Sequence, residues 1–116
     1  MCTQGNDTTT CSTSVAVTFD ELVTTVVGQT VYIVGNTTAL GSWAPASGVA
    51  LSAAAYTSAD PLWYVKLVMT AGTAVEYKFV TINESGTVTW EGGSNRVYPV
   101  PGDCVTAATV SDTWQS

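Results

Sequence analysis

Short runs of β-branched and aromatic residues, separated by turn-forming Gly, Pro and Asp, recur along this 116-residue chain. β-branched side chains lose rotamer freedom in helices and fit the pleated surface of a sheet. Runs of this length between turn signals are typical of an all-β domain. We therefore predict strands over residues 15–19, 30–34, 62–69, 75–82, 87–90, 97–100 and 105–110.

The spacing of these segments favours an antiparallel, immunoglobulin-like β-sandwich of Greek-key type, with a barrel as the alternative. Segment 30–34 is apolar on both faces, which predicts a central strand. The turn at 71–73 predicts that 62–69 and 75–82 form a hairpin. Residues 35–48 contain three Gly residues and one Pro and are predicted to form a long loop.

The charge of the chain excludes several classes of partner. Three Lys and Arg residues against nine Asp and Glu residues give a net charge of −6. So few cations cannot neutralise many phosphates, so neither nucleic acid nor an anionic membrane is an expected partner. No apolar run approaches the roughly 20 residues that span a bilayer. Because charged residues are scarce, Thr, Ser and Asn must cover the surface, which suits a secreted, extracellular protein.

The N-terminal segment differs in composition from the remainder. Residues 1–10 are small and polar and are predicted to be a Ser/Thr-rich linker or a remnant of expression, ahead of one domain at 11–116. Acceptor triplets for N-glycosylation begin at Asn6, Asn36 and Asn83. Short triplets of this kind also arise by chance in a Thr-rich chain, so their use stays open.

The three cysteines give no metal signal. Cys2, Cys11 and Cys104 show no C-x-x-C spacing, and the chain has no His, so neither a metal site nor a cofactor is expected. A bridge between Cys11 and Cys104 would tie together the two ends of the domain. Cys2 would then be an exposed thiol or a site of intermolecular pairing.

Two tryptophans occupy positions that are unusual for core residues. Trp43 lies in a Gly- and Pro-containing loop, and Trp90 ends a strand just before the polar residues Glu91 and Asn95. An aromatic ring can cover the C–H face of a sugar, while polar side chains, including Lys78 on the outward side of its strand, can bind the hydroxyls. The alternative is that both indoles cap the ends of the sandwich.

The other aromatic residues give weaker signals. Trp63 lies within a strand and is expected to be structural, and Trp114 is expected to pack at an edge. Tyr56 lies in a loop and is a candidate binding ring. No Ser-His-Asp set can form without His, and a pair of carboxylates among nine is a nonspecific signal, so we do not expect an enzyme.

The loop and strand motifs together resemble the starch-binding domains of carbohydrate-binding module family 20, especially the C-terminal domain of fungal glucoamylases. The likeness covers nearly all of residues 11–114. The matching stretches are VAVTF at 15–19, VYIVG at 31–35, LGSW at 40–43, YTSADPLWY at 56–64, EYKF at 76–79, VTWE at 88–91 followed by Asn95-Arg96, and VSDTW at 110–114.

This resemblance implies a disulfide between Cys11 and Cys104 and two sites for α-1,4-glucan. Trp43, Lys78, Trp90, Glu91 and Asn95 match the first site, and none of them is missing.

At the second site Tyr56 matches one of two tyrosine rings. Val27 replaces the other ring, and Ala54 replaces an acidic residue. The second site is therefore expected to be weak or lost.

The resulting hypothesis is a monomeric, noncatalytic module that binds starch, amylose, maltooligosaccharides and cyclodextrins. It would target a covalently linked catalytic domain to granular starch. The alternative is an immunoglobulin-like protein-interaction or adhesion domain whose tryptophans face another protein.

Overall fold

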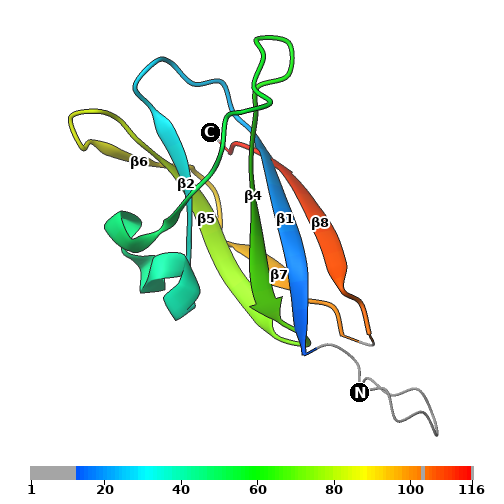
Figure 1. The fold of residues 1–116 in the computed structure, drawn as a ribbon. Helices are drawn as coiled ribbons and strands as arrows, with labels where there is room; N and C mark the ends of the chain where they lie inside the picture. Colours follow the sequence, from blue (N-terminus) through cyan, green and yellow to red (C-terminus); the bar gives the residue numbers. More distant parts are fainter. Residues whose placement is uncertain (1–12, 103, 116) are drawn as a thin grey trace, which may run out of the picture.

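The computed structural model describes residues 13–102 and 104–115, which form eight strands and two short 3₁₀ turns (Figure 1). The strands are β1 (Ser14–Leu22), β2 (Thr30–Gly35), β3 (Val49–Ala50), β4 (Leu62–Thr70), β5 (Ala74–Ile82), β6 (Val88–Trp90), β7 (Arg96–Pro99) and β8 (Ala107–Thr113), with the turns η1 (Thr38–Trp43) and η2 (Pro45–Ser47) between β2 and β3. No helical segment in these two ranges has the length and apolar character needed to cross a bilayer.

The strands form two sheets that face each other, which confirms the predicted β-sandwich. The first sheet has the order β4-β1-β8, and the second has the order β3-β2-β5-β6, with β7 also paired to β5. The central position predicted for residues 30–34 is confirmed, because β2 lies between β3 and β5. All pairs are antiparallel except β1 and β8, which run parallel.

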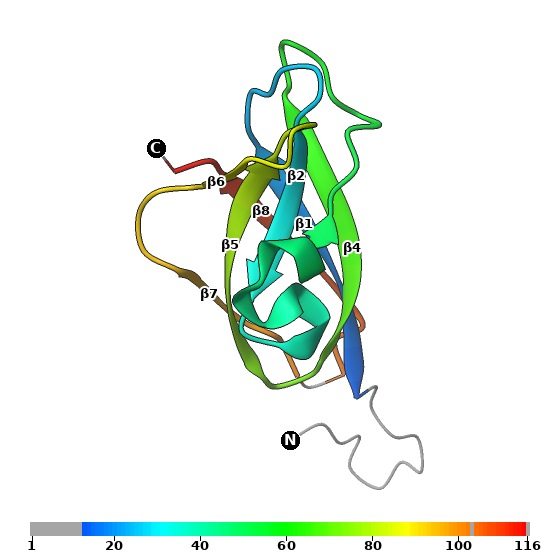
Figure 2. The same ribbon diagram turned by 90° about the vertical axis from the view of Figure 1, so that its left-hand side faces the viewer.

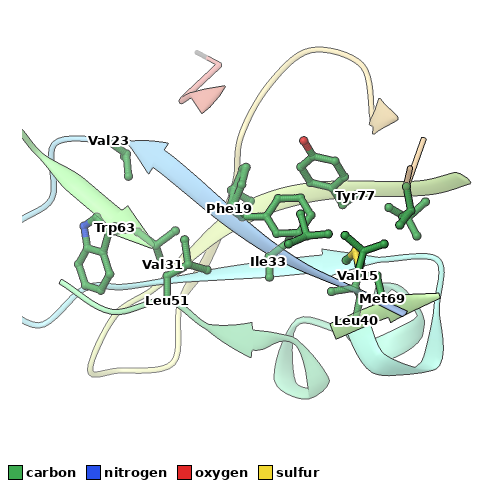
Figure 3. Packing of buried hydrophobic residues seen from close by; sticks show 14 residues of the cluster. Val15, Phe19, Val23, Val31, Ile33, Leu40, Leu51, Trp63, Met69 and Tyr77 are labelled. Carbon is green, nitrogen blue, oxygen red and sulfur yellow. The ribbon is translucent and has the colours of Figure 1, made fainter. Parts of the chain in front are cut away.

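The core lies between the sheets and is built from alternate residues of each long strand. On β1 the side chains of Val15, Val17 and Phe19 are fully buried, while the residues between them are partly exposed. Phe19 meets the Tyr77 ring of the opposite sheet edge-on, with ring centroids 5.1 Å apart (Figure 3). Such interlocking aromatic contacts fix how the two sheets sit on each other.

The predicted hairpin between residues 62–69 and 75–82 is wrong. β4 pairs with β1 in the first sheet, whereas β5 pairs with β2 in the second. The connecting turn bonds to its neighbours: Ala71 N–H donates to the Thr13 carbonyl, and Gly72 N–H donates to the Val100 carbonyl. Met69 and Val75 then face the core from opposite sides. Residue alternation cannot distinguish a hairpin within one sheet from an arch between two sheets, because both bury one face of each strand.

The predicted long loop at 35–48 is more ordered than expected, because it holds η1 and η2. Figure 2 shows both turns lying in front of the outer face of the second sheet. There they cover part of β2, and Val34 on that face is fully buried. Gly48 lies so close that a Cβ there would sit 3.3 Å from Val34 Cγ2. The turns therefore make this sheet, unlike the first, partly buried on both faces.

Candidate functional site

The register of the second sheet places two of the candidate residues, Lys78 and Trp90, on its outer face. Trp90 of β6 lies directly opposite Val80 of β5. Glu76 and Lys78 point the same way as Val80, because side chains two residues apart share a face. Val80 is fully buried although it lies on the outer face. Other side chains on this face therefore cover Val80.

Trp43 and Trp90 come together at this surface. Their ring centroids are 6.5 Å apart and their planes are inclined by 38°. Trp90 remains 41% exposed, and Trp43 is half-buried. The two indoles therefore form an accessible, angled pair, and the alternative that they only cap the ends of the sandwich does not fit these positions.

The segment before Trp43 fixes the position of its ring. Leu40 is fully buried, and the Thr37 hydroxyl caps η1 by accepting from the Leu40 N–H at 3.2 Å. Gly41, Ser42 and Trp43 then adopt left-handed φ values of 82°, 50° and 68°. For residues other than glycine this conformation costs energy and persists only where the surroundings enforce it. A Cβ at Gly41 would lie 2.6 Å from the Ser47 backbone, so glycine is required there.

Lys78 and Asn95 border the pair of indoles. The Lys78 ammonium donates to the Gly93 carbonyl at 2.6 Å and to the Gly92 carbonyl at 3.4 Å. Asn95 is exposed, and its side-chain amide donates to Glu76 Oε1 at 3.4 Å. Lys78 therefore holds the loop that follows Trp90, while Asn95 keeps hydrogen-bonding capacity towards solvent.

The expected role of Glu91 needs correction. Its side chain is only 1% exposed. β6 ends at Trp90, but the Glu91 N–H still donates to the Phe79 carbonyl, so the alternation continues for one residue and Glu91 points away from the face of Trp90. Its Oε1 accepts from the Phe79 N–H at 3.0 Å and from Arg96 Nε at 2.9 Å. The carboxylate therefore anchors the loop from inside and does not face a ligand.

Glu91 belongs to a buried polar cluster that the sequence analysis missed. Arg96 Nη2 also lies 2.9 Å from Glu91 Oε2, and Arg96 Nη1 lies 3.2 Å from Asp112 Oδ1. Asp112 accepts from the Tyr77 hydroxyl at 2.7 Å. Burial alone would lower the pKa of Arg96, but the hydrogen bond and the charge of Glu91 outweigh it and raise the pKa. Arg96 therefore stays charged and joins β7 to β8.

Glu21 is the unusual member of this region. Its side chain is fully buried, and neither carboxyl oxygen has a hydrogen-bond partner. Burial, together with the nearby charges of Glu91 and Asp112 and against that of Arg96, raises its pKa to about 8. The signal was available in the sequence, because Glu21 is in phase with the inward-facing Val15, Val17 and Phe19.

Tyr56, the candidate ring of the second site, is half-buried. Its hydroxyl accepts from the Thr25 N–H at 3.2 Å and donates to the Thr25 carbonyl at 3.4 Å. Val27 in the same loop as Thr25 is fully exposed, and Ala54 is also exposed. Figure 1 shows the loops 23–29 and 51–61 together at the upper end, away from η1 and η2. The structure therefore brings Tyr56 to Thr25 and pairs it with no second exposed ring.

The remaining tryptophans follow the predictions. Trp63 is 7% exposed, and its indole N–H donates to the Thr25 hydroxyl at 3.3 Å. Trp114 is half-buried just beyond the edge strand β8, and its backbone N–H donates to the Leu22 carbonyl.

Several sequence predictions fall on residues that the structure does not describe. Cys2, Cys11, Asn6 and the linker at 1–10 lie outside the described residues, so the disulfide from Cys104 stays a prediction. Within 13–102 and 104–115 there is no group of three or more Cys, Asp or Glu side chains that could hold a metal ion.

The arrangement is suited to noncovalent recognition of a neutral ligand. The two inclined indoles offer apolar faces, and Asn95 and Lys78 supply polar groups at the rim. A pyranose has the complementary features, with C–H groups on its face and hydroxyls around its edge. Among the described carboxylates, Glu76 lies on this face within hydrogen-bond distance of Asn95, and Glu91 is buried behind it.

Comparison with known proteins agrees with this geometry. Residues 14–110 match the family described as the starch binding domain. The chain is 52% identical over 101 residues to a glucoamylase of Neurospora crassa, covering 87% of this chain and 16% of that protein. It is 50% identical over 110 residues to an AA13 family lytic polysaccharide monooxygenase A of Pyricularia oryzae, covering 92% and 29% respectively. The chain thus spans less than a third of these relatives.

Solved structures give the same result. The glycoside hydrolase family 15 glucoamylase from Hypocrea jecorina matches with a TM-score of 0.87 and 49% identity, over 91% of this chain and 18% of that one. The family 20 module of the maltotetraose-forming amylase from Pseudomonas saccharophila STB07 matches with a TM-score of 0.64 and 32% identity, over 83% and 100%. The chain therefore belongs to the starch binding domain family and is a noncatalytic binding module rather than an enzyme.

Proposed function

We propose that this module binds α-1,4-glucans, among them amylose, maltooligosaccharides and cyclodextrins, by stacking sugar rings on Trp43 and Trp90. The observation that carries the proposal is the accessible indole pair, 6.5 Å apart and inclined by 38°. Inclined rings suit a curved, helical glucan better than a flat chain such as cellulose. Asn95 and the ammonium of Lys78 bind hydroxyls at the rim, and any contact of Glu91 with the glucan comes from its backbone.

We further propose that the module acts as a monomer and carries an attached catalytic domain to granular starch. The support is that the chain matches only 16% and 29% of two relatives, which are named as a glucoamylase and a polysaccharide monooxygenase. Bringing an enzyme to an insoluble substrate raises its effective concentration there, whichever bond chemistry the enzyme uses.

The Thr- and Ser-rich composition and three glycosylation triplets support a secreted, extracellular glycoprotein with a Cys11–Cys104 disulfide. Asn36 and Asn83 are both exposed, as glycan acceptors must be. Mass measurement of the chain secreted from a eukaryotic host, before and after enzymatic removal of N-glycans and with and without reductant, tests both modifications. An unchanged mass in both comparisons would refute them.

Sedimentation with raw starch granules tests the main proposal. The native chain should sediment with the granules, whereas the double variant Trp43→Ala/Trp90→Ala should stay in solution. Val68→Ala is the matched control, because Val68 is 71% exposed but lies on β4 in the other sheet. Retention of granule binding by the double variant would contradict the proposal. Urea unfolding of all three chains checks that the variants remain folded.

Titration calorimetry with β-cyclodextrin tests the number of sites. Because Val27 and Ala54 replace a ring and an acid at the second site, we expect one dominant site per chain. Two sites of similar affinity would contradict this part of the proposal.

A further inference from the structure

A cleft opens between the two sheets at the end of the sandwich near Trp114. Its volume is about 520 Å³. Its walls come from the end of β1 and the loop that follows it, from Pro61, from β5 and β6, and from the end of β8 with Trp114. This volume lies within the ~300–1,000 Å³ that is usual for small-molecule sites. Neither Tyr56 nor Val27 lines it, although Thr24 and Gln29 belong to the same loop as Val27.

The lining of this cleft is neutral and rich in hydroxyl groups. It contains no charged side chain, and its polar members are Thr24, Gln29, Thr81, Thr89 and Thr113 beside the Trp114 indole. Within the described part of the chain, the four threonine hydroxyls make no hydrogen bond to another protein group, and neither does the Trp114 indole N–H. Their hydrogen-bonding capacity is therefore left for a molecule in the cleft.

Thr81 shows this most clearly. Its residue is only 6% exposed and it points into the space between the sheets, opposite Thr89 on β6. A buried hydroxyl normally finds a partner, because leaving it unpaired costs about 1–3 kcal/mol. Since the hydroxyl is not sealed from solvent, it is satisfied from the cleft, by water or by a bound molecule.

We propose that this cleft is an additional sugar site, which binds one or two pyranose units of a neutral oligosaccharide. The half-buried Trp114 ring covers the apolar face of the sugar, while the threonine hydroxyls and the Gln29 amide bind its hydroxyls. An anionic ligand is disfavoured, because the lining has no cation and the chain has a net charge of −6. A cation is disfavoured as well, because the lining offers no carboxylate.

Fluorine NMR of the chain labelled with 5-fluorotryptophan tests the proposal, with maltose as the probe. The background variant is Trp43→Ala/Trp90→Ala, which leaves only the Trp63 and Trp114 signals. We expect the Trp114 signal to shift and saturate with maltose. Because Thr81→Val removes one hydroxyl without changing the shape of the side chain, it should weaken the apparent affinity by roughly threefold to tenfold. Thr109→Val, an exposed change on β8 outside the cleft, should leave the affinity unchanged.

The choice of maltose rests on the proposed function, but the two ideas fail separately. An unmoved Trp114 signal, or an identical titration of Thr81→Val and its background, overturns the additional site even if the native chain sediments with starch. Failure of the native chain to bind starch, together with a saturable Trp114 shift, instead refutes the role of Trp43 and Trp90 and leaves the cleft in place.

Discussion

The two candidate glucan sites differ in how many rings they expose and in what holds those rings. At the first site Trp43 and Trp90 lie 6.5 Å apart, and a buried ion pair between Glu91 and Arg96 secures the loop behind them. At the second site the single ring of Tyr56 is half-buried, and its hydroxyl is already bonded to Thr25. The first site thus has two rings whose loop is held by a buried ion pair. The second site has one ring, which is held by uncharged hydrogen bonds.

This difference teaches that aromatic residues in loops are not equivalent ligand groups. A ring contributes to binding when a neighbour shares the ligand and when its own polar atom is not needed for folding. Tyr56 meets neither condition fully, because its neighbouring ring, Trp63, is buried and its own hydroxyl is hydrogen-bonded to Thr25. Four predictions test the comparison.

The largest effect is expected from pH, through the Glu21 carboxyl behind the first site. Its pKa is about 8 in the folded chain against an ordinary value of 4.5, so the folded state binds the extra proton between these values. The free energy of unfolding should therefore fall as pH rises from about 4.5 to about 8, by something of the order of 5 kcal/mol. Glu21→Gln should remove this fall and be the more stable chain at pH 8.5.

Urea unfolding at pH 5 and pH 8.5 measures this effect, with Glu76→Gln as the exposed control. Parallel pH dependence in the native chain and Glu21→Gln would show that Glu21 titrates normally.

Glu91→Gln should destabilise the fold by about 3–4 kcal/mol, because it leaves the partly buried Arg96 without its main charged partner. Since Glu91 also fixes the loop after Trp90, the variant should bind β-cyclodextrin more weakly even under conditions where it is fully folded. Thermal unfolding and calorimetry measure the two effects. A destabilised chain with native affinity would show that the buried cluster supports the fold but not the first site.

Trp90→Ala and Tyr56→Ala compare the two sites directly. Removing a central ring from a binding surface commonly costs 2 kcal/mol or more, so Trp90→Ala should weaken β-cyclodextrin binding by at least about 30-fold. Tyr56→Ala should change it by less than about threefold. Equal losses in the two variants would mean that the sites contribute alike.

The smallest expected effect is a gain of ligand binding at the second site. Val27 is fully exposed, so Val27→Tyr can place a second ring near Tyr56 without disturbing the core. We expect a second, weak β-cyclodextrin site to become measurable by calorimetry, with unchanged affinity at the first. Val26→Tyr is the matched control, since Val26 is also exposed in the same loop. A stoichiometry that stays at one for Val27→Tyr would show that the missing ring is not what limits this site.

The sequence predicted the features that depend on the alternation of residues within one strand. It did not predict which of the two sheets each strand joins. The inward phase of Val15, Val17 and Phe19 predicted a half-buried strand, and the outward phase of Lys78 placed it on the site face. The arch between β4 and β5 was missed, because alternation is the same in an arch and a hairpin. The role of Glu91 was missed because a position beside an exposed Trp suggested exposure, although neighbours in a strand face opposite ways.

The parallel pairing of β1 with β8 has a consequence for how a larger protein would use this module. β1 begins at one pole of the sandwich, and β8 ends at the other, where Leu22 lies beside Thr113. A polypeptide joined ahead of β1 is therefore tethered at the pole remote from the loop of Tyr56, while the indole pair faces sideways. On the proposed function, such a tether leaves the outer face of the second sheet, which carries the indoles, free to contact a granule.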